Sequence, residues 1–410
     1  VVAIGDYSFM NCNIGNLVLP KTAQSIGIGS FMGNKNMVAA EISASKIKVG
    51  VGAFYNCPML VSISLNAPVI SAQLFNGCTG LESVKLGKDV AVIGQYAFNA
   101  CDKLTEITVD KKNPYLTSED GIIYNKDKTE VVLVPRFKAT ATLTLPETVT
   151  KIGKGAFSGV KRIGKVIGKN VTVIDDYAFS DCTSLYSASF GNVTEIGSYA
   201  FANTGLENLP SFDKGTGEYA LKTIGDYAFA YTNLETVDFR EYGDGLEIGS
   251  YAFFECKNLT SFIAGNDVTI GDYAFASRIQ LYTYENYQNT SYLADPRYYK
   301  EVKEKVIDAD GNERTFYNLY YQIEAGANST LAEVKLGNNA QIGNYAFLFN
   351  VNLKKVELGT DAKIGDYAFS TCKNLDTINL NNVKSIGDYA FSGITTMVYT
   401  KRDSRYSYAY

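Results

Sequence analysis

The chain has 410 residues, of which 46% are hydrophobic and 20% are charged, a balance that supports a large buried core and excludes a disordered polymer. The formal net charge is −5 with no basic stripe, so no nucleic-acid partner is expected. Histidine is absent, which excludes Ser-His-Asp and Cys-His catalysis and imidazole metal sites. No apolar run approaches the roughly 18 residues of a transmembrane helix.

One hexapeptide, most regular as Ile-Gly-Asp-Tyr-Ala-Phe, returns fourteen times, and its uninterrupted copies are 21 to 24 residues apart. A period of this length, with one supersecondary unit per copy, is typical of a stacked solenoid. Every copy ends on a phenylalanine, and these residues are Phe9, Phe31, Phe54, Phe75, Phe98, Phe157, Phe179, Phe201, Phe229, Phe253, Phe275, Phe347, Phe369 and Phe391. We expect the rings to stack inside the solenoid as a spine.

The first run of repeats covers residues 1–109, and residues 81–98 show its pattern clearly. Leu81, Val84 and Leu86 alternate with polar residues, as in a half-buried strand. Stacked copies of this strand should pair in parallel as one long sheet, because every connection runs the same way around the coil. Its outward positions are small and polar, which suits a large partner better than a small molecule.

The hexapeptide is expected on the opposite side of each coil. Its third position is Asp, Ser or Asn in nine copies, and these side chains cap helix N-termini. The predicted fold is therefore an α/β solenoid, a horseshoe or superhelix with a long parallel β-sheet and one short helical turn per repeat. The tyrosine that follows in ten copies is predicted to cover the coil edge; an aromatic stripe that grips sugars or peptides is the alternative.

Two segments interrupt the period. In residues 110–138, β-prone runs at 121–124 and 131–135 flank a polar turn and predict a hairpin. Repeats resume over 139–276, and a tyrosine-rich insertion follows over 277–333, with hairpin-like runs at 302–307 and 315–323. Repeats and a C-terminal cap complete one continuous solenoid domain over 334–410. Insertions in solenoids map to loops on one face, often the binding face.

The tyrosines of the second insertion are the candidate ligand-binding residues. No repeat requires them, and tyrosine is enriched where a protein needs large amphipathic contact area. The alternative is that they pack the insertion against the solenoid. The candidates are Tyr282, Tyr284, Tyr287, Tyr292, Tyr298, Tyr299, Tyr317 and Tyr320.

All seven cysteines fall three residues after a repeat phenylalanine, where other copies carry Asn, Thr, Val or Ile. We expect free, buried thiols that act as small hydrophobes with a weak donor. Cys57, Cys78 and Cys101 lie in consecutive coils, so a disulfide is the alternative there. The regular aspartates are expected to cap rather than to form a calcium ladder, and no metal or cofactor is predicted.

The unit I-G-x-Y-A-F-x-x-C-x-x-L-x-x-I-x-L resembles the repeat of the BspA-type leucine-rich repeat proteins of bacterial and some protist cell surfaces. Residues 113–135 also resemble an insertion common in that family. The resemblance implies a leucine-rich-repeat horseshoe or superhelix, an extracellular or cell-surface location, and adhesion to host extracellular-matrix proteins, such as fibronectin and fibrinogen, or to glycans. It implies no catalytic residues.

The leading functional hypothesis is a non-enzymatic binding protein that presents its sheet face and its tyrosine-rich insertion to a protein or a glycan. One alternative is a carboxylate-pair glycosidase on a parallel β-solenoid, for which Asp238 is the nearest sheet-face candidate. The other is an architectural surface-layer protein that assembles end to end.

Overall fold

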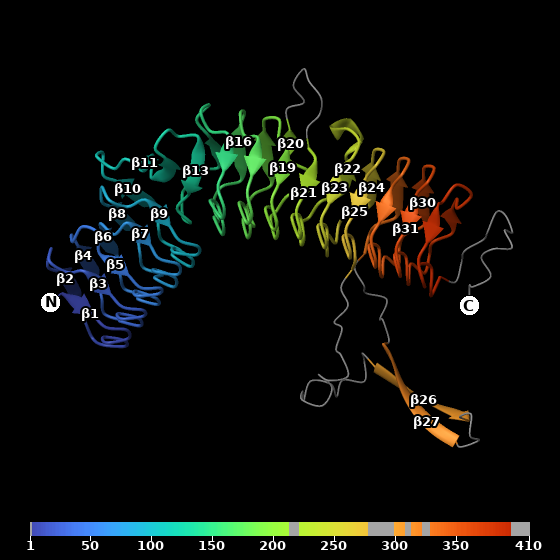
Figure 1. Ribbon diagram of the computed structural model, residues 1–410, viewed down its shortest axis with the longest axis horizontal. Helices are drawn as coiled ribbons and strands as arrows, with labels where there is room; N and C mark the ends of the chain where they lie inside the picture. Colours follow the sequence, from blue (N-terminus) through green and yellow to red (C-terminus); the bar gives the residue numbers. More distant parts are fainter. Residues whose placement is uncertain (1, 213–220, 278–298, 308–312, 322–328, 395–410) are drawn as a thin grey trace.

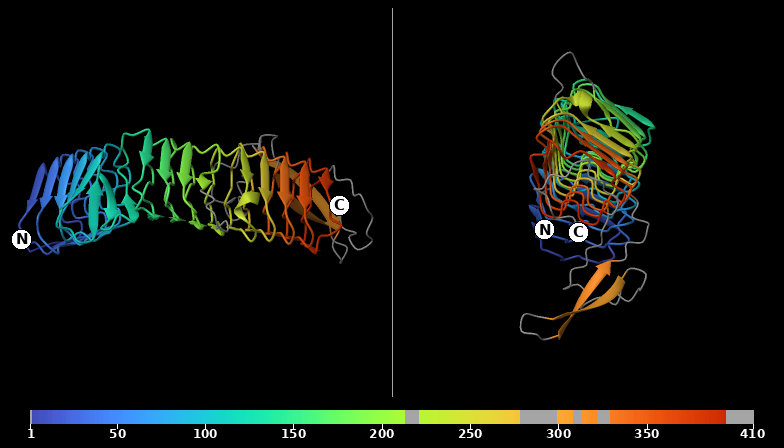
Figure 2. Two further views of the ribbon diagram at one scale, coloured as in Figure 1. Left: turned by 90° about the horizontal axis from the view of Figure 1, so that it is seen from above. Right: turned by 90° about the vertical axis from the view of Figure 1, so that its right-hand side faces the viewer.

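The computed structural model describes residues 2–212, 221–277, 299–307, 313–321 and 329–394. For 299–307 and 313–321 it gives the backbone pairing. The coils follow one another in an elongated solenoid whose direction changes near β11 and β13 (Figure 1). The end-on view in Figure 2 shows successive coils superposed along the axis.

The first side of each coil carries the strand whose apolar residues point inward. In β24, for example, Phe262 and Ala264 are buried while Ser261 and Ile263 are half-buried. These strands pair in parallel in three sheets. The five-stranded first sheet contains β2 (Asn16–Leu19), β4 (Ala39–Ile42), β6 (Ser62–Leu65), β8 (Ser83–Leu86) and β10 (Glu106–Val109). The four-stranded second sheet contains β14 (Thr142–Thr144), β16 (Lys165–Gly168), β18 (Ser187–Phe190) and β20 (Ser211–Phe212). The five-stranded third sheet contains β22 (Thr236–Asp238), β24 (Ser261–Ala264), β28 (Glu333–Leu336), β30 (Lys355–Leu358) and β32 (Thr377–Ile378).

Parallel pairing is confirmed, but the single long sheet is not, because it breaks twice. The first break lies at the insertion after β10. At the second, Pro210 directly precedes the two-residue strand β20, and proline cannot donate a backbone hydrogen bond. One isolated bridge, between Asn208 and Thr236, is all that joins the described strands across this point.

The second side of each coil carries a two-residue strand that ends at the first hexapeptide residue. The N-terminal coils contribute β1 (Ala3–Ile4), β3 (Ser25–Ile26) and β5 (Lys48–Val49), then β7 (Val69–Ile70) and β9 (Val92–Ile93). A twelve-stranded sheet then runs from the first insertion to the last described coil. Its strands are β11 (Leu116–Glu119), β12 (Ile122–Asn125), β13 (Glu130–Leu133), β15 (Lys151–Ile152), β17 (Val173–Ile174), β19 (Glu195–Ile196), β21 (Thr223–Ile224), β23 (Glu247–Ile248), β25 (Thr269–Ile270), β29 (Gln341–Ile342), β31 (Lys363–Ile364) and β33 (Ser385–Ile386).

The helical turn predicted for each repeat is wrong. The tyrosines at the fourth hexapeptide position have φ between 54° and 59°, whereas a right-handed helix needs about −60°. Where glycine or glutamine replaces tyrosine, φ is the same, for example 60° at Gly52 and 54° at Gln73. The single helix among the described residues is η1 (Arg240–Tyr242), a 3₁₀ turn outside the hexapeptide. The fold is therefore a β-solenoid rather than α/β, and no described helix has the length and apolar character to cross a bilayer.

Alternating directions of the backbone amides explain why the hexapeptide forms a turn rather than a helix. The backbone nitrogens of Tyr227 and Phe229 donate to Ser250 O and Ala252 O of the next coil, at 3.0 and 2.8 Å. The intervening Ala228 donates within its own coil, to the carbonyl of Gly225 at 3.3 Å. A helix would direct all these amides along its own axis. The turn instead adds inter-coil hydrogen bonds, which every coil needs to satisfy its backbone.

The glycine at the second hexapeptide position is required by this close stacking. A Cβ on Gly225 would lie 2.5 Å from the backbone nitrogen of Ser198 in the preceding coil. A Cβ on Gly387 would lie 2.3 Å from the Asp366 carboxylate. Glycine therefore serves here for the space that it leaves rather than for its φ.

The phenylalanine spine is confirmed, with one interruption. Consecutive rings stack with centroids 4.6 to 5.8 Å apart from Phe9 to Phe98, and again from Phe157 to Phe391. The hydrophobic core divides in the same place. Along β12, Ile123 packs with the N-terminal core, and Ile122 and Tyr124 pack with the C-terminal core.

The residue three positions after each phenylalanine supplies a hydrogen bond to the spine. Cys182 Sγ donates to Phe157 O of the preceding coil at 2.9 Å, and Cys372, Cys78 and the other buried cysteines make the same contact. Asn34 occupies this position in the second coil and donates to Phe9 O at 2.7 Å. All seven cysteines are free thiols, six of them buried and Cys12 exposed.

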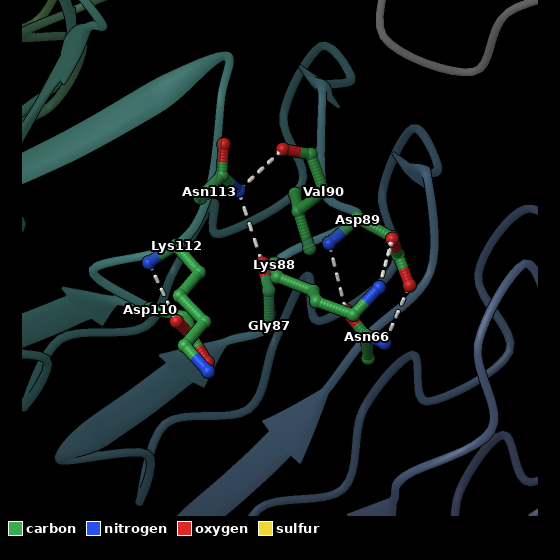
Figure 3. A network of polar contacts seen from close by, with 8 residues as sticks. All are labelled: Asn66, Gly87, Lys88, Asp89, Val90, Asp110, Lys112 and Asn113. Carbon is green, nitrogen blue, oxygen red and sulfur yellow. Dashed lines mark hydrogen bonds and ion pairs between the residues drawn. The ribbon is translucent and has the colours of Figure 1, made fainter.

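The first insertion is part of the sheet. β11, β12 and β13 form an antiparallel meander, and β13 pairs in parallel with β15. Asn113, fully buried, joins its start to the preceding coil through its Nδ2, which donates to Gly87 O at 3.0 Å and Val90 O at 2.7 Å (Figure 3). In the next coil back, Asn66 Oδ1 accepts from the Asp89 amide at 2.9 Å. Buried and half-buried amides thus fasten consecutive coils at this corner.

Candidate functional site

The tyrosine candidates of the second insertion are only partly covered by the structure. The residues that lie outside the described ranges are Tyr282, Tyr284, Tyr287, Tyr292 and Tyr298. Tyr299 begins β26 (Tyr299–Ile307), which pairs antiparallel with β27 (Glu313–Tyr321), where the sequence predicted a hairpin. In this register Tyr317 is opposite Lys303, and Tyr320 is opposite Lys300.

The outward side of the third sheet carries a lattice of ion pairs. Glu333 lies 3.2 Å from Lys335 on its own strand and 3.3 Å from Lys355 on the next. Lys355 also pairs with Glu357. These side chains are partly exposed, so each pair contributes little to stability. These ion pairs give the outward face of the sheet both positive and negative charges, with no region of a single sign.

Among the described strands, Asp238 has no carboxylate beside it in register. Its partner in the next strand is Ile263, and Arg240 binds its carboxylate with Nε–Oδ1 3.0 Å. The Arg240 guanidinium holds the pKa of Asp238 below its usual range. A glycosidase pair needs two acids with separated pKa values flanking a cleft, and the residue paired with Asp238 on the next strand is not an acid.

The aspartates of the hexapeptide accept hydrogen bonds from the next coil rather than from their own. Asp226 Oδ1 accepts from Ser250 N at 2.7 Å, and Asp366 Oδ1 accepts from Asp388 N at 2.8 Å. Asn344 performs the same role for the Asp366 amide at 2.8 Å. The predicted hydrogen bonds from backbone amides to these side chains are thus present, but the amides belong to the next coil rather than to the same hexapeptide. Within the described ranges, no group of three His, Cys, Asp or Glu side chains could hold a metal ion.

The tyrosines of the hexapeptide form a continuous column of stacked rings. We call it the tyrosine column, and its eight members are Tyr177, Tyr199, Tyr227, Tyr251, Tyr273, Tyr345, Tyr367 and Tyr389. Neighbouring centroids lie 4.6 to 5.0 Å apart. The inner members are half-buried, because each ring covers the faces of its neighbours and leaves its edge outward. Desolvation, with smaller contributions from Tyr251 and Tyr199, raises the pKa of Tyr227 to about 12.

This column changes the predicted role of the repeat tyrosines. A sugar cannot stack on the inner rings, since both faces of each are covered by other tyrosines. What the column offers a partner is a row of ring edges at the coil spacing. Sequence reasoning placed the rings at the coil edge but not in contact, because contact depends on the left-handed φ that it did not foresee.

A cleft interrupts the line of tyrosines where the solenoid changes direction. Its volume is about 160 Å³, and it lies between Tyr96 and Tyr177. We call it the bend cleft, and its other lining residues include Ile93, Phe98, Leu104, Val132, Val134, Arg136 and Lys154. The cleft was not predicted from the sequence.

A shortened coil produces the bend cleft. Val131 pairs with Ile152, and Val134 N donates to Ala156 O at 2.8 Å, as a phenylalanine does in a regular coil. The segment 131–134 therefore replaces a full hexapeptide and has no residue at the tyrosine position. The next coil carries Gly155 there, with φ 64°. Two successive levels of the solenoid thus lack a ring.

Two cations stand at the bend cleft. Arg136 is largely buried, and it donates from Nη1 to Asn99 Oδ1 at 3.1 Å and from Nε to Asp102 Oδ1 at 3.4 Å. Lys154 is half-exposed, and its Nζ lies 3.1 Å from Asp176 Oδ2 and 5.9 Å from the centre of the Tyr177 ring. The lining contains no carboxylate, since Asp102 and Asp176 stand outside it.

The sequence profile of the BspA type leucine rich repeat region matches this chain in six copies, over residues 2–120, 136–219, 211–304 and 312–405. The chain belongs to the BspA-type leucine-rich repeat family. The resemblance drawn from the hexapeptide is therefore confirmed. Among curated proteins, none matches this member of the family.

Solved structures share the solenoid. A leucine-rich repeat protein from Bacteroides ovatus matches with a TM-score of 0.54 and 21% identity, over 92% of this chain and 84% of that one. One from Eubacterium ventriosum matches with a TM-score of 0.46 and 19% identity, over 96% and 86%. The pneumococcal vaccine antigen PcpA matches with a TM-score of 0.45 and 16% identity, over 95% and 71%. At these identities the similarity concerns the fold alone.

Proposed function

We propose that this BspA-type protein is a non-enzymatic, extracellular or cell-surface adhesion protein that binds a host extracellular-matrix protein or a glycan. The placement outside the cell and the choice of partner rest on family membership. The structure contributes a surface suited to a long partner, because the same side-chain types recur at every coil along one axis.

The tyrosine column is the observation that carries this proposal. The turn needs a left-handed residue, for which glycine is the least costly choice, and Gly29, Gly52 and Gly155 fill the position in other coils. A tyrosine in this conformation costs about 1–2 kcal/mol. Stacking contributes about 0.5–1.5 kcal/mol per ring pair beyond the area that it buries, so the strain cancels a large part of what stacking contributes. A contact surface supplies a further reason for eight consecutive tyrosines.

The hydroxyl groups are the recognition elements in this proposal. Because inner ring faces are covered, a partner gains hydrogen bonds to tyrosine hydroxyls and contacts with ring edges. Tyrosine is well suited to such interfaces, since it presents a rigid apolar body with a polar tip. The β26–β27 hairpin would add a second contact in this proposal.

A binding array of matrix proteins and glycans tests the proposal with matched variants. The triple substitution Tyr227→Phe, Tyr251→Phe and Tyr273→Phe keeps the stacked rings and removes three hydroxyls. A partner found with the intact chain should bind this variant at least tenfold more weakly, while circular dichroism and melting stay unchanged. Full retention of affinity would show that the hydroxyls of the tyrosine column do not bind the partner. Removing the second insertion in a parallel variant measures its separate contribution.

A further inference from the structure

We propose that the bend cleft is a binding site for a small planar aromatic anion, of one or two fused rings bearing a carboxylate. This site is distinct from the extended surface proposed above and does not depend on it. It follows from three properties of the cleft: its position in the line of tyrosines, its charge and its size.

The position favours a flat ring. Tyr177 begins the tyrosine column, with Tyr199 stacked on one face at 4.9 Å. The level on its other side belongs to Gly155, at the position where ten of the other thirteen hexapeptides carry tyrosine. A Cβ on Gly155 would meet Ser158 Cβ at 4.0 Å at the nearest. An aromatic ligand at this level continues the stack from Tyr177 toward Tyr96. The cleft thus lies at a level of the solenoid that has no tyrosine ring.

The charge favours an anion. Arg136 and Lys154 line the cleft without a carboxylate in the lining. Asp102 is shared, because Lys161 Nζ also lies 3.1 Å from its Oδ1. Arg136 and Lys161 therefore share one carboxylate, which leaves positive charge beside the cleft, whereas Lys154 is paired with Asp176 and also faces Asp175. A ligand carboxylate can pair with the Lys154 ammonium while its ring lies beside Tyr177.

The size favours a compact ligand. The volume of about 160 Å³ is close to the roughly 150 Å³ of an engineered protein cavity that admits benzene. Ile93, Phe98 and Val134 supply apolar walls, which are typical of small-molecule sites with a few placed polar groups. A polymer chain would not fit, and a cation would meet the lysine and the arginine.

The experiment uses three probes of one shape: 2-naphthoate, neutral 2-naphthylmethanol and cationic 2-naphthylmethylamine, each titrated into the full chain by calorimetry. We expect 2-naphthoate to bind with a dissociation constant below about 1 mM, at least fivefold more tightly than the alcohol. The amine should bind more weakly than either. Equal binding of all three, or none of 2-naphthoate, would overturn the proposal.

Gly155→Tyr is the decisive variant, because it places a tyrosine where the column lacks one and fills the cleft. It should abolish 2-naphthoate binding. Gly52→Tyr is the matched control, since it makes the same change at the same turn position, φ 60°, in a coil remote from the cleft. It should bind 2-naphthoate as the unmodified chain does. Unchanged binding by Gly155→Tyr would place the probe elsewhere and refute the site.

A second variant keeps the test independent of how Gly155→Tyr folds. Lys154→Gln alters a half-exposed side chain, removes its charge and keeps a polar end. It should weaken 2-naphthoate roughly threefold to fivefold, as expected for one partly exposed ion pair, and leave 2-naphthylmethanol unchanged. If both probes keep their original affinities, the lysine has no part in binding and the anionic preference is refuted.

Discussion

Asp272 Oδ1 lies 2.7 Å from the backbone nitrogen of Asn344, although the two residues are 72 positions apart in the chain. The same two coils stack Phe275 on Phe347 at 5.1 Å. All the inter-coil contacts of a regular repeat are thus present across the tyrosine-rich insertion. The insertion leaves the coil after Ser277 and the next described residue of that coil is Ser329, so it is an addition to the solenoid rather than part of its stack.

Deleting residues 278–327 should therefore leave a folded solenoid. Joining Ser277 to Asn328 places Leu331 six residues after Phe275, the spacing of Phe347 and Leu353 in a regular coil. Thermal unfolding followed by circular dichroism should stay cooperative, with a melting temperature equal to or above that of the intact chain, because a long loop no longer has to be closed.

A deletion of residues 110–138 is the contrasting variant. Its β13 pairs directly with β15, and Val131 and Val134 belong to the buried core. This deletion should lower the melting temperature strongly. If the two deletions had equal effects, the distinction between an added and an integrated insertion would fail.

Replacing Tyr227 by glycine and by alanine tests the left-handed turn. Both variants lose two stacking contacts, worth about 0.5–1.5 kcal/mol each. Alanine retains the strain of φ 56°, whereas glycine relieves it, so Tyr227→Gly should be more stable than Tyr227→Ala by about 1 kcal/mol. In a helical turn the order would be reversed, with alanine better by about 1 kcal/mol. Urea unfolding of the two variants decides between the conformations.

The hydrogen bond from the Asn344 amide to Asp272 allows the charge of the aspartate and its acceptor oxygen to be tested separately. Asp272→Asn should change the free energy of unfolding little, because asparagine keeps the acceptor oxygen and Asn344 already serves this purpose. Asp272→Ala should lose about 1 kcal/mol, since the Asn344 amide loses its acceptor. A large loss in the asparagine variant, together with stabilisation of the unmodified protein by added calcium, would instead support a metal ladder.

The sequence was sufficient for the parts of the fold that depend on burial. Phe229 belongs to the phenylalanines that end every hexapeptide and is inside, and the alternation of Val237 with polar neighbours places β22 correctly. Both predictions follow from period and hydrophobicity alone. The position of Cys256 was also predictable as an interior turn, because residues of similar size replace it elsewhere.

The turn and the cleft depend on properties that composition does not express. Asp-Tyr-Ala has ordinary helix-start chemistry, and the left-handed φ of Tyr227 follows from the hydrogen bonds to Ser250 and Ala252 in the next coil. One signal was available: Gly29, Gly52 and Gly155 at the tyrosine position are unexpected in a helix and ordinary in a left-handed turn. The bend cleft required knowledge that 131–134 substitutes for a hexapeptide, which only strand pairing shows.

The spine predicts a position-dependent cost for losing one ring. Phe229 is fully buried between Phe201 and Phe253, at 5.2 and 5.3 Å, so Phe229→Ala should cost about 3–5 kcal/mol. Phe391 is half-buried and stacks only on Phe369 among the described rings, at 5.4 Å, so Phe391→Ala should cost clearly less. Denaturant unfolding measures both. Equal losses of unfolding free energy in the two variants would contradict a stacked spine in which an end ring is more exposed than an inner ring.

The tyrosine column should make the solenoid sensitive to alkali. Burial raises the folded-state pKa of Tyr227 to about 12 from an ordinary value of 10.0, so its neutral form is favoured by folding. The stabilisation is complete below pH 10 and is lost as the pH rises from 10 toward 12, because the unfolded chain releases its proton first. Tyr227→Phe has no proton to lose, so its free energy of unfolding should fall less steeply over this range. Tyr186→Phe, at an exposed tyrosine outside the column, should follow the unmodified protein. A phenolate absorbance titration provides the direct check: ionisation of Tyr227 at its ordinary pKa in the folded protein would show that its ring is not packed between its neighbours.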